Sequence, residues 1–272
     1  MVGGGNLKKT QSIVSKRRER ILEYLKENKT INTNELANRL EISPLTLRRD
    51  LQALDDEGLI IRYYGGAKLV SDPADSRNNT TGNAENTLHT NLVKKQHAIA
   101  KYAAGLIDDG DTIFINSSTT ALLILEYLKD KRVNVVTNNG KALNSTIGPN
   151  VSLILTGGQV YERKQSLIGD FAIRILSSIT ADKCFLGVSG IASDSGISTS
   201  VFQETLVNHE MIKRCSGPVY VLTDSSKVGR HHNFSSGDIN EITHLITDSD
   251  IEESSIKEFE KKGLSVIALN YD

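Results

Sequence analysis

From Leu92 onward, short aliphatic runs alternate with stretches of helical periodicity, such as 202–214 and 251–262. In chain order, the aliphatic runs are DTIFIN, VNVVTN, VSLILTGG, KCFLGVSG, PVYVLTD, THLITD and LSVIAL. Short strands that alternate with helices form a parallel sheet that is covered by helices on both faces. The sequence therefore predicts an α/β fold with a Rossmann-like parallel sheet in this part of the chain.

Small polar tails follow five of these runs, and their sequences are NSSTT, TNNGK, TGGQ, VSG and TDSSK. In open α/β sheets, the loops at the carboxyl ends of the strands converge on one crevice, where ligands bind. Ser, Asn, Gly and Asp are also the usual residues of ordinary turns. The repetition of one kind of tail nevertheless favours a ligand-binding site over turn chemistry alone.

The chemistry of the tails suits a phosphorylated sugar or polyol. Hydroxyl groups, together with free backbone N–H groups at a helix start, donate hydrogen bonds to an anion. The glycine pair 157–158 lets backbone approach a ligand closely, and Lys227 supplies a positive charge for phosphate. The Asp224 carboxylate and two amides suit sugar hydroxyls. The predicted effector-binding residues are Asn116, Ser117, Ser118, Thr119, Thr120, Asn138, Asn139, Gly157, Gly158, Asp224, Ser226 and Lys227.

The first 70 residues have a different pattern, with short helical segments followed by an alternating stretch. Ser43 as N-cap and Pro44 at the first helical position mark the start of a helix, a few residues after the segment NELANRL. This spacing is typical of a helix-turn-helix, in which Leu47, Leu51 and Leu54 would face inward. The stretch LIIRYYGGAKL then predicts a β-hairpin, or wing.

The outward face of the second helix carries side chains that can read DNA. Arg binds guanine edges or phosphates, Gln binds adenine, and Thr and Leu contact thymine methyl groups. A solvated basic face occurs on many small helical domains, but a capped basic helix followed at once by a hairpin favours DNA binding. The predicted DNA-binding residues are Ser43, Leu45, Thr46, Arg48, Arg49, Gln52, Arg62 and Lys68.

Composition divides the chain between these two patterns. Residues 71–90 are rich in Asn, Thr, Ser and Asp and poor in aliphatic residues, which predicts a linker. We therefore expect a flexible extension over 1–14, a winged helix-turn-helix over 15–70 and a large domain over 91–272. Residues 1–70 carry 13 Lys and Arg against 9 Asp and Glu, a net charge of +4, whereas the remainder carries 19 against 24, a net charge of −5. This asymmetry agrees with a polyanion partner for the front of the chain alone.

Several other functions are not supported by the residues. No apolar run approaches the roughly 18 residues that span a bilayer, so we expect no membrane partner and a cytoplasmic location. Cys184 and Cys215 lie in apolar surroundings, which predicts buried thiols rather than a disulfide or metal pair. Adjacent histidines at 231–232 are expected to be surface imidazoles, and we expect neither a metal nor a cofactor. Ser117 and Ser118 lack the G-x-S-x-G context of a hydrolase nucleophile.

The N-terminal motifs resemble the winged helix-turn-helix of the DeoR family of bacterial transcriptional regulators. The most specific features are SPLTLRRDL at Ser43–Leu51 and GGA at Gly65–Ala67. In the large domain, GDTIFINSSTT, VVTNN, TGG, IGD, FLGVSGI and TDSSKVG follow the family's order. The resemblance covers about residues 16–250. It implies a repressor of a sugar or polyol operon that binds double-stranded operator DNA. It also implies a homo-oligomer, dimer or tetramer, assembled by an effector-sensing domain that is similar in fold to ribose-5-phosphate isomerase and binds a phosphorylated sugar.

Three sites depart from the family pattern. The family usually has D-x-G-T-T where this chain has Asn116 and Ser118, and usually has His at the position of Tyr64. Basic residues are common in the family where this chain has Asn208 and His209. The first change removes a carboxylate from the predicted ligand crevice. The resemblance therefore leaves two alternatives open for the effector: a different, more anionic ligand or a changed response.

Two alternatives stay open from the residues. A sugar-phosphate isomerase-like enzyme would need a carboxylate base near the substrate, and Asp224 is a candidate, whereas Asn116 cannot act as a base. We expect no isomerised product from pentose or hexose phosphates. The other alternative is a ligand-sensing scaffold whose front domain binds a protein. A steep loss of affinity with salt would distinguish DNA binding from that alternative.

Overall fold

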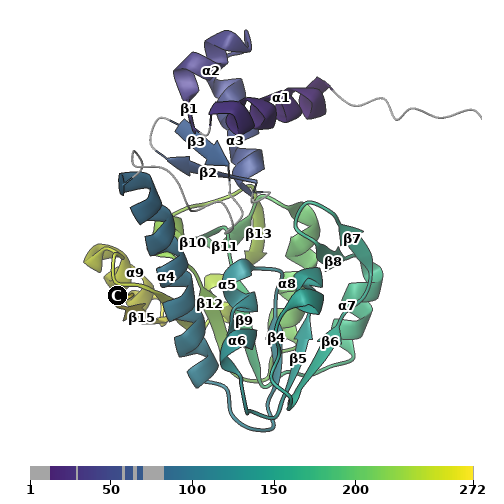
Figure 1. Cartoon of the computed structure of the whole chain (residues 1–272). Helices are drawn as coiled ribbons and strands as arrows, with labels where there is room; N and C mark the ends of the chain where they lie inside the picture. Colours follow the sequence, from purple (N-terminus) through teal and green to yellow (C-terminus); the bar gives the residue numbers. More distant parts are fainter. Residues whose placement is uncertain (1–12, 29, 57–58, 64–65, 70–82, 272) are drawn as a thin grey trace, which may run out of the picture. The chain divides into compact units, whose positions relative to one another are not determined.

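The computed structural model describes residues 13–28, 30–56, 59–63, 66–69 and 83–271 (Figure 1). The chain divides into two compact units, Met1–Asn79 and Thr80–Asp272. Each unit has an apolar core of its own, so each is held together by its own buried side chains.

The N-terminal unit has the predicted winged helix-turn-helix. Its described elements are α1 (Ile13–Asn28), β1 (Thr30–Asn32), α2 (Thr33–Arg39), α3 (Pro44–Asp56), β2 (Ile60–Tyr63) and β3 (Gly66–Leu69). Helices α2 and α3 are the predicted helix pair, and β2 pairs antiparallel with β3, with Ile60 opposite Leu69. Strand β1, which the sequence did not predict, pairs with the other side of β3.

Helix α3 is fixed by an apolar face and by buried ion pairs. The apolar residues of this face are buried, as their spacing predicts, and are Leu47, Leu51 and Leu54. Asp50 is also buried on α3, and its carboxylate binds the guanidinium groups of Arg17 and Arg18 on α1. The hydrogen bond to Asp50 raises the pKa of Arg17. Because an unpaired buried carboxylate is strongly destabilising, these pairs hold α3 against α1.

The C-terminal unit contains a seven-stranded sheet in the order β15-β14-β12-β9-β4-β5-β6. Every neighbouring pair of its strands is parallel. Each aliphatic run predicted from the sequence forms one strand of this sheet, which confirms the α/β prediction. The strands are β4 (Thr112–Ile115), β5 (Val133–Thr137), β6 (Val151–Leu155), β9 (Lys183–Gly187), β12 (Val219–Leu222), β14 (His244–Asp248) and β15 (Ser265–Leu269).

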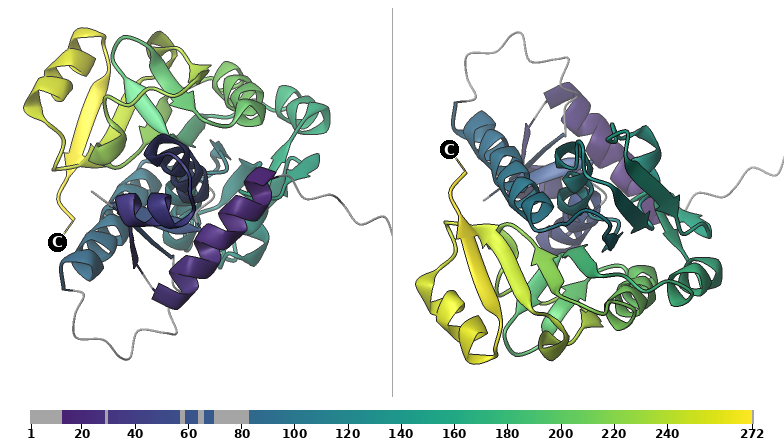
Figure 2. Two further views of the ribbon diagram at one scale, coloured as in Figure 1. Left: turned by 90° about the horizontal axis from the view of Figure 1, so that it is seen from above. Right: turned by 90° about the horizontal axis from the view of Figure 1, so that it is seen from below.

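Helices cover both faces of the sheet, as two views at right angles to that of Figure 1 show (Figure 2). One face is covered by α4 (Asn83–Gly105), α5 (Thr119–Leu122) and α6 (Ile124–Tyr127). The other face is covered by α7 (Asp170–Ser177), α8 (Phe202–Lys213) and α9 (Glu253–Lys261). Side chains alternate between the two cores, with Ile113 and Ile115 on the first face and Phe114 on the second. None of the described helices is long and apolar enough to cross a membrane.

Two small antiparallel elements were not predicted. One is the hairpin of β7 (Gln159–Tyr161) and β8 (Ser166–Ile168), and the other is a sheet of β10 (Gly190–Ala192), β11 (Gly196–Thr199) and β13 (Phe234–Gly237). These strands are three or four residues long and lack an aliphatic run. Tertiary pairing rather than local propensity determines strands of this kind.

The predicted linker was wrong in its last part. Residues 71–82 lie outside the described part of the chain, but residues 83–90 form the first turns of α4. The apolar end of α4 is packed on the sheet, and extending an established helix is much less costly than starting one. A polar composition therefore does not end the helix. Likewise α1 begins at Ile13, inside the predicted extension over 1–14, whose first 12 residues lie outside the description.

Candidate functional site

The strand order reverses between β4 and β9. From β4 the chain adds β5 and β6 on one side, and then returns to add β9, β12, β14 and β15 on the other. At such a switch point the loops after the two central strands run to opposite faces, and ligands bind at the carboxyl ends between them. The polar tails that the sequence singled out follow these strands, so the topology brings their residues to one edge of the sheet.

The loop after β4 closes tightly on β9. Ser118 caps α5, and its hydroxyl accepts a hydrogen bond from the Ala121 backbone N–H (3.4 Å). A Cβ atom on Gly187, the last residue of β9, would lie 1.7 Å from the Ser118 hydroxyl oxygen. Only glycine at 187 leaves room for Ser118, whose side chain therefore fills the switch point itself. Of the two threonines in this tail, Thr119 is exposed and Thr120 is buried.

Asn116 is a buried clamp between β4 and β9. Its amide nitrogen donates to the Gly187 carbonyl (2.9 Å) and to the Asn208 side-chain oxygen (3.2 Å). Its amide oxygen accepts from the backbone N–H groups of Gly187 (3.0 Å) and Ser118 (3.3 Å). An asparagine side chain offers two donors and two lone pairs, and all are occupied. Contrary to the prediction, the Asn116 side chain has no hydrogen-bonding atom left for an effector.

The contact between Asn116 and Asn208 joins two of the departures from the family pattern. Asn208 lies on α8, and its amide nitrogen donates in turn to the Ser236 hydroxyl on β13 (2.7 Å). The contact between these two positions is therefore a hydrogen bond between two neutral amides.

A buried carboxylate next to this clamp was not predicted. Glu204 on α8 is 6% exposed, and one of its oxygens accepts from the Ser117 hydroxyl (3.1 Å). The other oxygen binds the ammonium group of Lys164 (2.9 Å), between β7 and β8, and the hydroxyl of Thr199 (3.4 Å) on β11. Glu204 and Lys164 lie outside the strand tails, because they come from a helix and from a hairpin without a strong strand signal. We call Asn116, Ser117, Lys164, Thr199, Glu204 and Asn208 the switch-point cluster.

The amides after β5 are also buried. The Asn139 side chain donates to the Ser118 carbonyl (3.3 Å) and accepts from the Lys141 backbone N–H (3.1 Å). The Asn138 side chain donates to the Leu167 carbonyl (3.1 Å), but its oxygen has no hydrogen-bond partner among the described residues. The tail after β5 thus supplies one unused buried acceptor.

The glycine pair after β6 serves the protein's own backbone. Gly157 and Gly158 both have positive φ, at 63° and 113°. A Cβ atom on Gly158 would lie 2.5 Å from the Ile168 carbonyl oxygen at the end of β8, whereas one on Gly157 would meet nothing within 4 Å. The close approach predicted for a ligand is therefore made at Gly158 by the β7–β8 hairpin.

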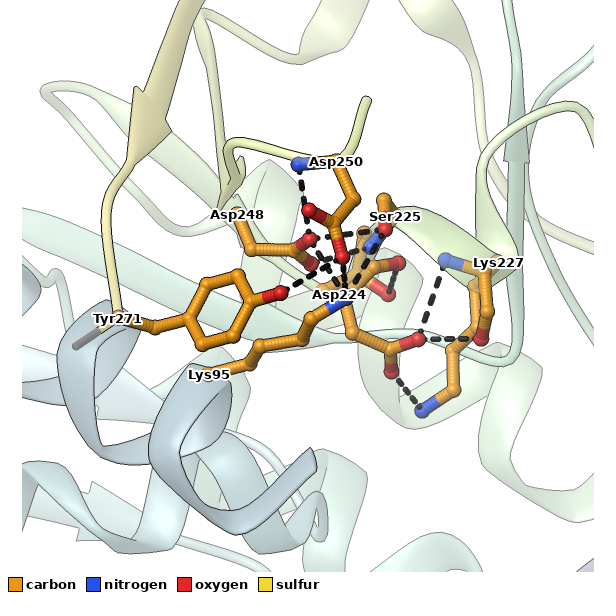
Figure 3. Close-up of polar contacts among 9 residues, drawn as sticks. Lys95, Asp224, Ser225, Lys227, Asp248, Asp250 and Tyr271 are labelled. Carbon is orange, nitrogen blue, oxygen red and sulfur yellow. Dashed lines mark hydrogen bonds and ion pairs between the residues drawn. The ribbon is translucent and has the colours of Figure 1, made fainter. Parts of the chain in front are cut away.

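The tail after β12 brings the predicted effector-binding residues Asp224, Ser226 and Lys227 together, and Figure 3 shows the contacts of this tail. Asp224 caps the 3-10 turn η3 (Ser225–Lys227), and its buried carboxylate accepts from the Ser226 N–H (3.2 Å) and hydroxyl. The Lys227 ammonium lies 3.3 Å from the same carboxylate. Burial alone would raise the pKa of Asp224, but Lys227 and Ser226 outweigh it and hold that pKa below its ordinary value. The charge of Lys227 is thus balanced within the protein.

A second ion group, which the sequence did not predict, adjoins this tail. Lys95 on α4 lies 2.8 Å from Asp248 and 2.6 Å from Asp250, as Figure 3 shows. Asp248 is fully buried, and it accepts from the Ser225 N–H (2.7 Å) and hydroxyl (2.9 Å). Burial lowers the pKa of Lys95, but the bonds to both carboxylates give a net increase. We call Lys95, Asp224, Ser225, Ser226, Lys227, Asp248 and Asp250 the β12–β14 cluster.

The described part of α3 presents the predicted DNA-reading side chains outward. Leu45 is 59% exposed, and Arg48 and Arg49 are also exposed. The Ser43 hydroxyl accepts from the Thr46 N–H (3.1 Å), so it caps the helix, while Thr46 and Lys68 are half-buried. The side chains of Gln52 and Arg62, and all of Tyr64, lie outside the described part of the chain. Contact of these residues with DNA stays a prediction.

The cysteines and adjacent histidines have ordinary surroundings. Cys184 is buried and Cys215 is half-buried, both are free thiols, and burial raises the pKa of each. His231 lies 3.1 Å from the Ser195 hydroxyl, and His232 lies 3.2 Å from the Ser189 carbonyl. Across the described residues, no three His, Cys, Asp or Glu side chains are grouped to hold a metal ion.

Comparisons with known proteins agree with this architecture. Residues 17–72 match the DeoR-like helix-turn-helix domain, and residues 91–249 match the DeoR C terminal sensor domain. An uncharacterized HTH-type transcriptional regulator, YulB of Bacillus subtilis (strain 168), is 31% identical over 94% of this chain and 97% of its own length. The glycerol-3-phosphate regulon repressor of Escherichia coli (strain K12) is 31% identical over 86% of this chain and 91% of its own length.

Among similar solved structures, ribose 5-phosphate isomerase A from Methanocaldococcus jannaschii covers 49% of this chain and 53% of its own, at 18% identity and a TM-score of 0.36. This likeness is limited to about half of each chain. The two matched domains and the nearly full-length relatives, by contrast, show that this chain belongs to the DeoR family of HTH-type transcriptional regulators.

Proposed function

We propose that the protein is a cytoplasmic repressor of a sugar or polyol operon, released from its operator by a phosphorylated sugar. The observation that carries the proposal is the pairing of an exposed, capped α3 with a sensor unit whose polar groups meet at a switch point. The name of the glycerol-3-phosphate regulon repressor supports an effector of this class. Release follows if the effector binds the DNA-free form more tightly, because the coupling between the two ligands is reciprocal.

The DNA partner is double-stranded, with α3 in the major groove and the β2–β3 wing at the backbone. Two winged units of a homo-oligomer, a dimer or a tetramer, would bind repeated half-sites, and the effector would change their spacing. Exposed Phe171, Phe202 and Leu206 on α7 and α8 supply apolar surface of the kind that is common at subunit contacts.

Replacing Arg48 or Arg49 by Ala should weaken specific operator binding by about 1–3 kcal/mol if the side chain reads a base. The measurement is fluorescence anisotropy of the selected operator against a scrambled duplex, at two salt concentrations. Lys101→Ala, which removes an exposed charge from α4, is the matched control. Operator affinity that is unchanged in both arginine variants would overturn the assignment of α3 as the recognition helix.

Replacing Lys227 by Ala should leave operator affinity intact and abolish release by the effector. Lys227 is the cation of the tail after β12, and its partner Asp224 can be satisfied by Ser226 when a phosphate takes over the ammonium group. The measurement is the anisotropy of bound operator as sugar phosphates are added. If release is normal in this variant, the phosphate binds at a different place.

Binding without turnover is the role that the groups favour. Isomerisation would need a carboxylate that accepts a carbon-bound proton. The pKa of Asp224 is held low by Lys227 and Ser226, which makes it a weak base, and Asn116 carries an amide. The isomerase-like alternative therefore lacks support at Asp224, the one position that the sequence offered for a base.

A further inference from the structure

Glu204 and Lys164 form a largely buried ion pair beside the switch point. The Glu204 side chain is 8% exposed and that of Lys164 is 21% exposed. Removing two charges from water costs about as much as their attraction returns, so such pairs add little net stability. The two residues come from α8 and from the turn between β7 and β8.

Two of the three groups that donate hydrogen bonds to Glu204 are hydroxyl groups, the kind of donor that a polyol also carries. The hydroxyl groups are those of Ser117 and Thr199, and the third donor is the Lys164 ammonium. A carboxylate accepts about four hydrogen bonds, so Glu204 can accept from a further hydroxyl group or exchange one of these for a ligand's. Ser117 stands in the loop after β4, so this carboxylate lies at the switch point, where ligands bind in such sheets.

A second observation comes from unpaired polar atoms beside the same hairpin. The side-chain oxygens of Asn138 and Ser166 are buried, at 1% and 0% residue exposure, and neither has a hydrogen-bond partner among the described residues. Ser166 follows Lys164 by two positions and pairs in register with Asn139, while Asn138 bonds to Leu167 through its carbonyl (2.7 Å) and its amide nitrogen (3.1 Å). The third such atom, the Thr247 hydroxyl, lies in β14.

Unpaired buried polar atoms cost about 1–3 kcal/mol each, so each of them calls for a partner such as a bound water, an ion or a ligand. An acceptor on Asn138 and a hydroxyl on Ser166, two residues after Lys164 in the same hairpin, match the donors and acceptors of adjacent sugar hydroxyls. Inorganic phosphate has no such array of hydroxyl groups on carbon and would not need these residues.

We propose that Glu204 and Lys164, with Asn138 and Ser166, bind the hydroxylated end of the effector and select sugar or polyol phosphates over phosphate alone. This inference rests on the proposed function, since it assigns the sugar end of the same effector. Lys227 then binds the phosphate end, and Asn116 supports the site through its hydrogen bonds to Gly187 and Asn208 without touching the ligand.

The experiment compares Glu204→Gln and Lys164→Met with the wild type as full-length proteins. Gln keeps the shape of Glu204 but removes its charge, and Met keeps the stem of Lys164 but removes its ammonium group. Glu210→Gln and Lys213→Met are matched controls on α8. A thermal-shift panel of triose, pentose and hexose phosphates, glycerol 3-phosphate and inorganic phosphate is followed by calorimetric titration of the panel member that stabilises the wild type most.

We expect each Glu204 and Lys164 variant to bind that sugar phosphate about 10- to 100-fold more weakly, as loss of a charge-assisted hydrogen bond predicts. Affinity for inorganic phosphate should stay within about twofold of the wild type, and both controls should bind normally. Because Lys164→Met leaves the buried Glu204 carboxylate without its cation, it should lower the melting temperature without ligand in either case. A purely structural pair would be distinguished by an unchanged affinity of the folded fraction.

Normal sugar-phosphate affinity in both Glu204→Gln and Lys164→Met would overturn this inference and leave the proposed function intact. Equal losses for inorganic phosphate and sugar phosphate would also overturn it, because they would place the phosphate at Glu204–Lys164. If no panel member stabilises the wild type, the sugar-phosphate part of the proposed function fails, and this inference fails with it.

Discussion

The two polar clusters at the carboxyl ends of the sheet use similar residues in different ways. In the β12–β14 cluster, buried Asp224 and Asp248 each accept hydrogen bonds from the backbone of η3 and each face a lysine. In the switch-point cluster, the one buried carboxylate found among the described side chains is Glu204, and it accepts only from side chains. Three buried side-chain oxygens lack a hydrogen-bond partner among the described residues, and two of them, on Asn138 and Ser166, lie in or beside the β7–β8 hairpin that carries Lys164.

This difference separates buried carboxylates that hold parts of the fold together from a buried carboxylate that can bind a ligand. Backbone donors are fixed by the fold, so the carboxylates of the β12–β14 cluster are tied to α4, η3 and the C-terminal strand region whether or not a ligand is present. Side-chain donors can rotate and exchange partners at lower cost. We therefore expect changes at Lys95 and Asp248 to cost mainly stability, and changes around Glu204 to cost mainly affinity. Lys227, whose side chain is one-third exposed, keeps its proposed role toward the phosphate.

The largest effect on stability is expected from Lys95→Met. This change leaves Asp248, which is fully buried, without its cation, and breaking a buried pair from one side costs about 3 kcal/mol or more. Urea unfolding followed by circular dichroism measures the loss. Lys101→Met, at an exposed position on α4, is the control and should stay within about 0.5 kcal/mol. A loss below about 1 kcal/mol for Lys95→Met would mean that the hydrogen bonds from Ser225 and from the Asp250 N–H are enough to hold Asp248, and the two clusters would then not differ in this way.

Asn116→Asp tests whether Asn116, in the switch-point cluster, has a structural role rather than a ligand-binding one. An aspartate can still accept from Gly187 and Ser118, but it cannot donate to the Gly187 carbonyl or to Asn208. Two acceptors would then face acceptors in a buried site, at a cost of about 2 kcal/mol.

The measurement is again urea unfolding, with Asn134→Asp at an exposed position on β5 as the control. A second titration, with the sugar phosphate that stabilises the wild type, should show little change in the affinity of the folded variant. Stability equal to that of the wild type would show that Asn116 is not the clamp, and a large change in affinity would return it to the ligand site.

The sequence predicted the fold well because the fold depends on local patterns. Each aliphatic run became a strand of the large sheet, and the spacing of Leu47, Leu51 and Leu54 gave the buried face of α3. The short strands β7, β8 and β10 were missed because they form by tertiary pairing rather than by propensity.

The candidate site was predicted in position but not in detail. Strand tails located the carboxyl end of the sheet, since that depends on topology. Lys95, Lys164 and Glu204 were missed because their partners are distant in the sequence. Lys95 is 155 residues from Asp250, Lys164 is 40 residues from Glu204, and Glu204 is 87 residues from Ser117. No local pattern reports such pairs, and for the same reason the sequence could not show that the Asn116 side chain is already fully bonded.

The smallest expected effect concerns the pH dependence of stability in the β12–β14 cluster. The pKa of Asp224 is lower in the folded protein than its ordinary value of about 3.9, so its stabilisation is complete above that pH and is lost as pH falls toward the folded pKa. Because Lys227 is one-third exposed, we expect a contribution of about 1 kcal/mol or less. Asp224→Asn should therefore reduce the drop in unfolding free energy between about pH 5 and about pH 3, whereas Asp130→Asn, at an exposed position, should not. If the unfolding free energy of Asp224→Asn falls as steeply with pH as that of the wild type, the Asp224 carboxylate gains no stability from Lys227 and Ser226. Carboxylates held by backbone donors would then not set the β12–β14 cluster apart from the switch-point cluster.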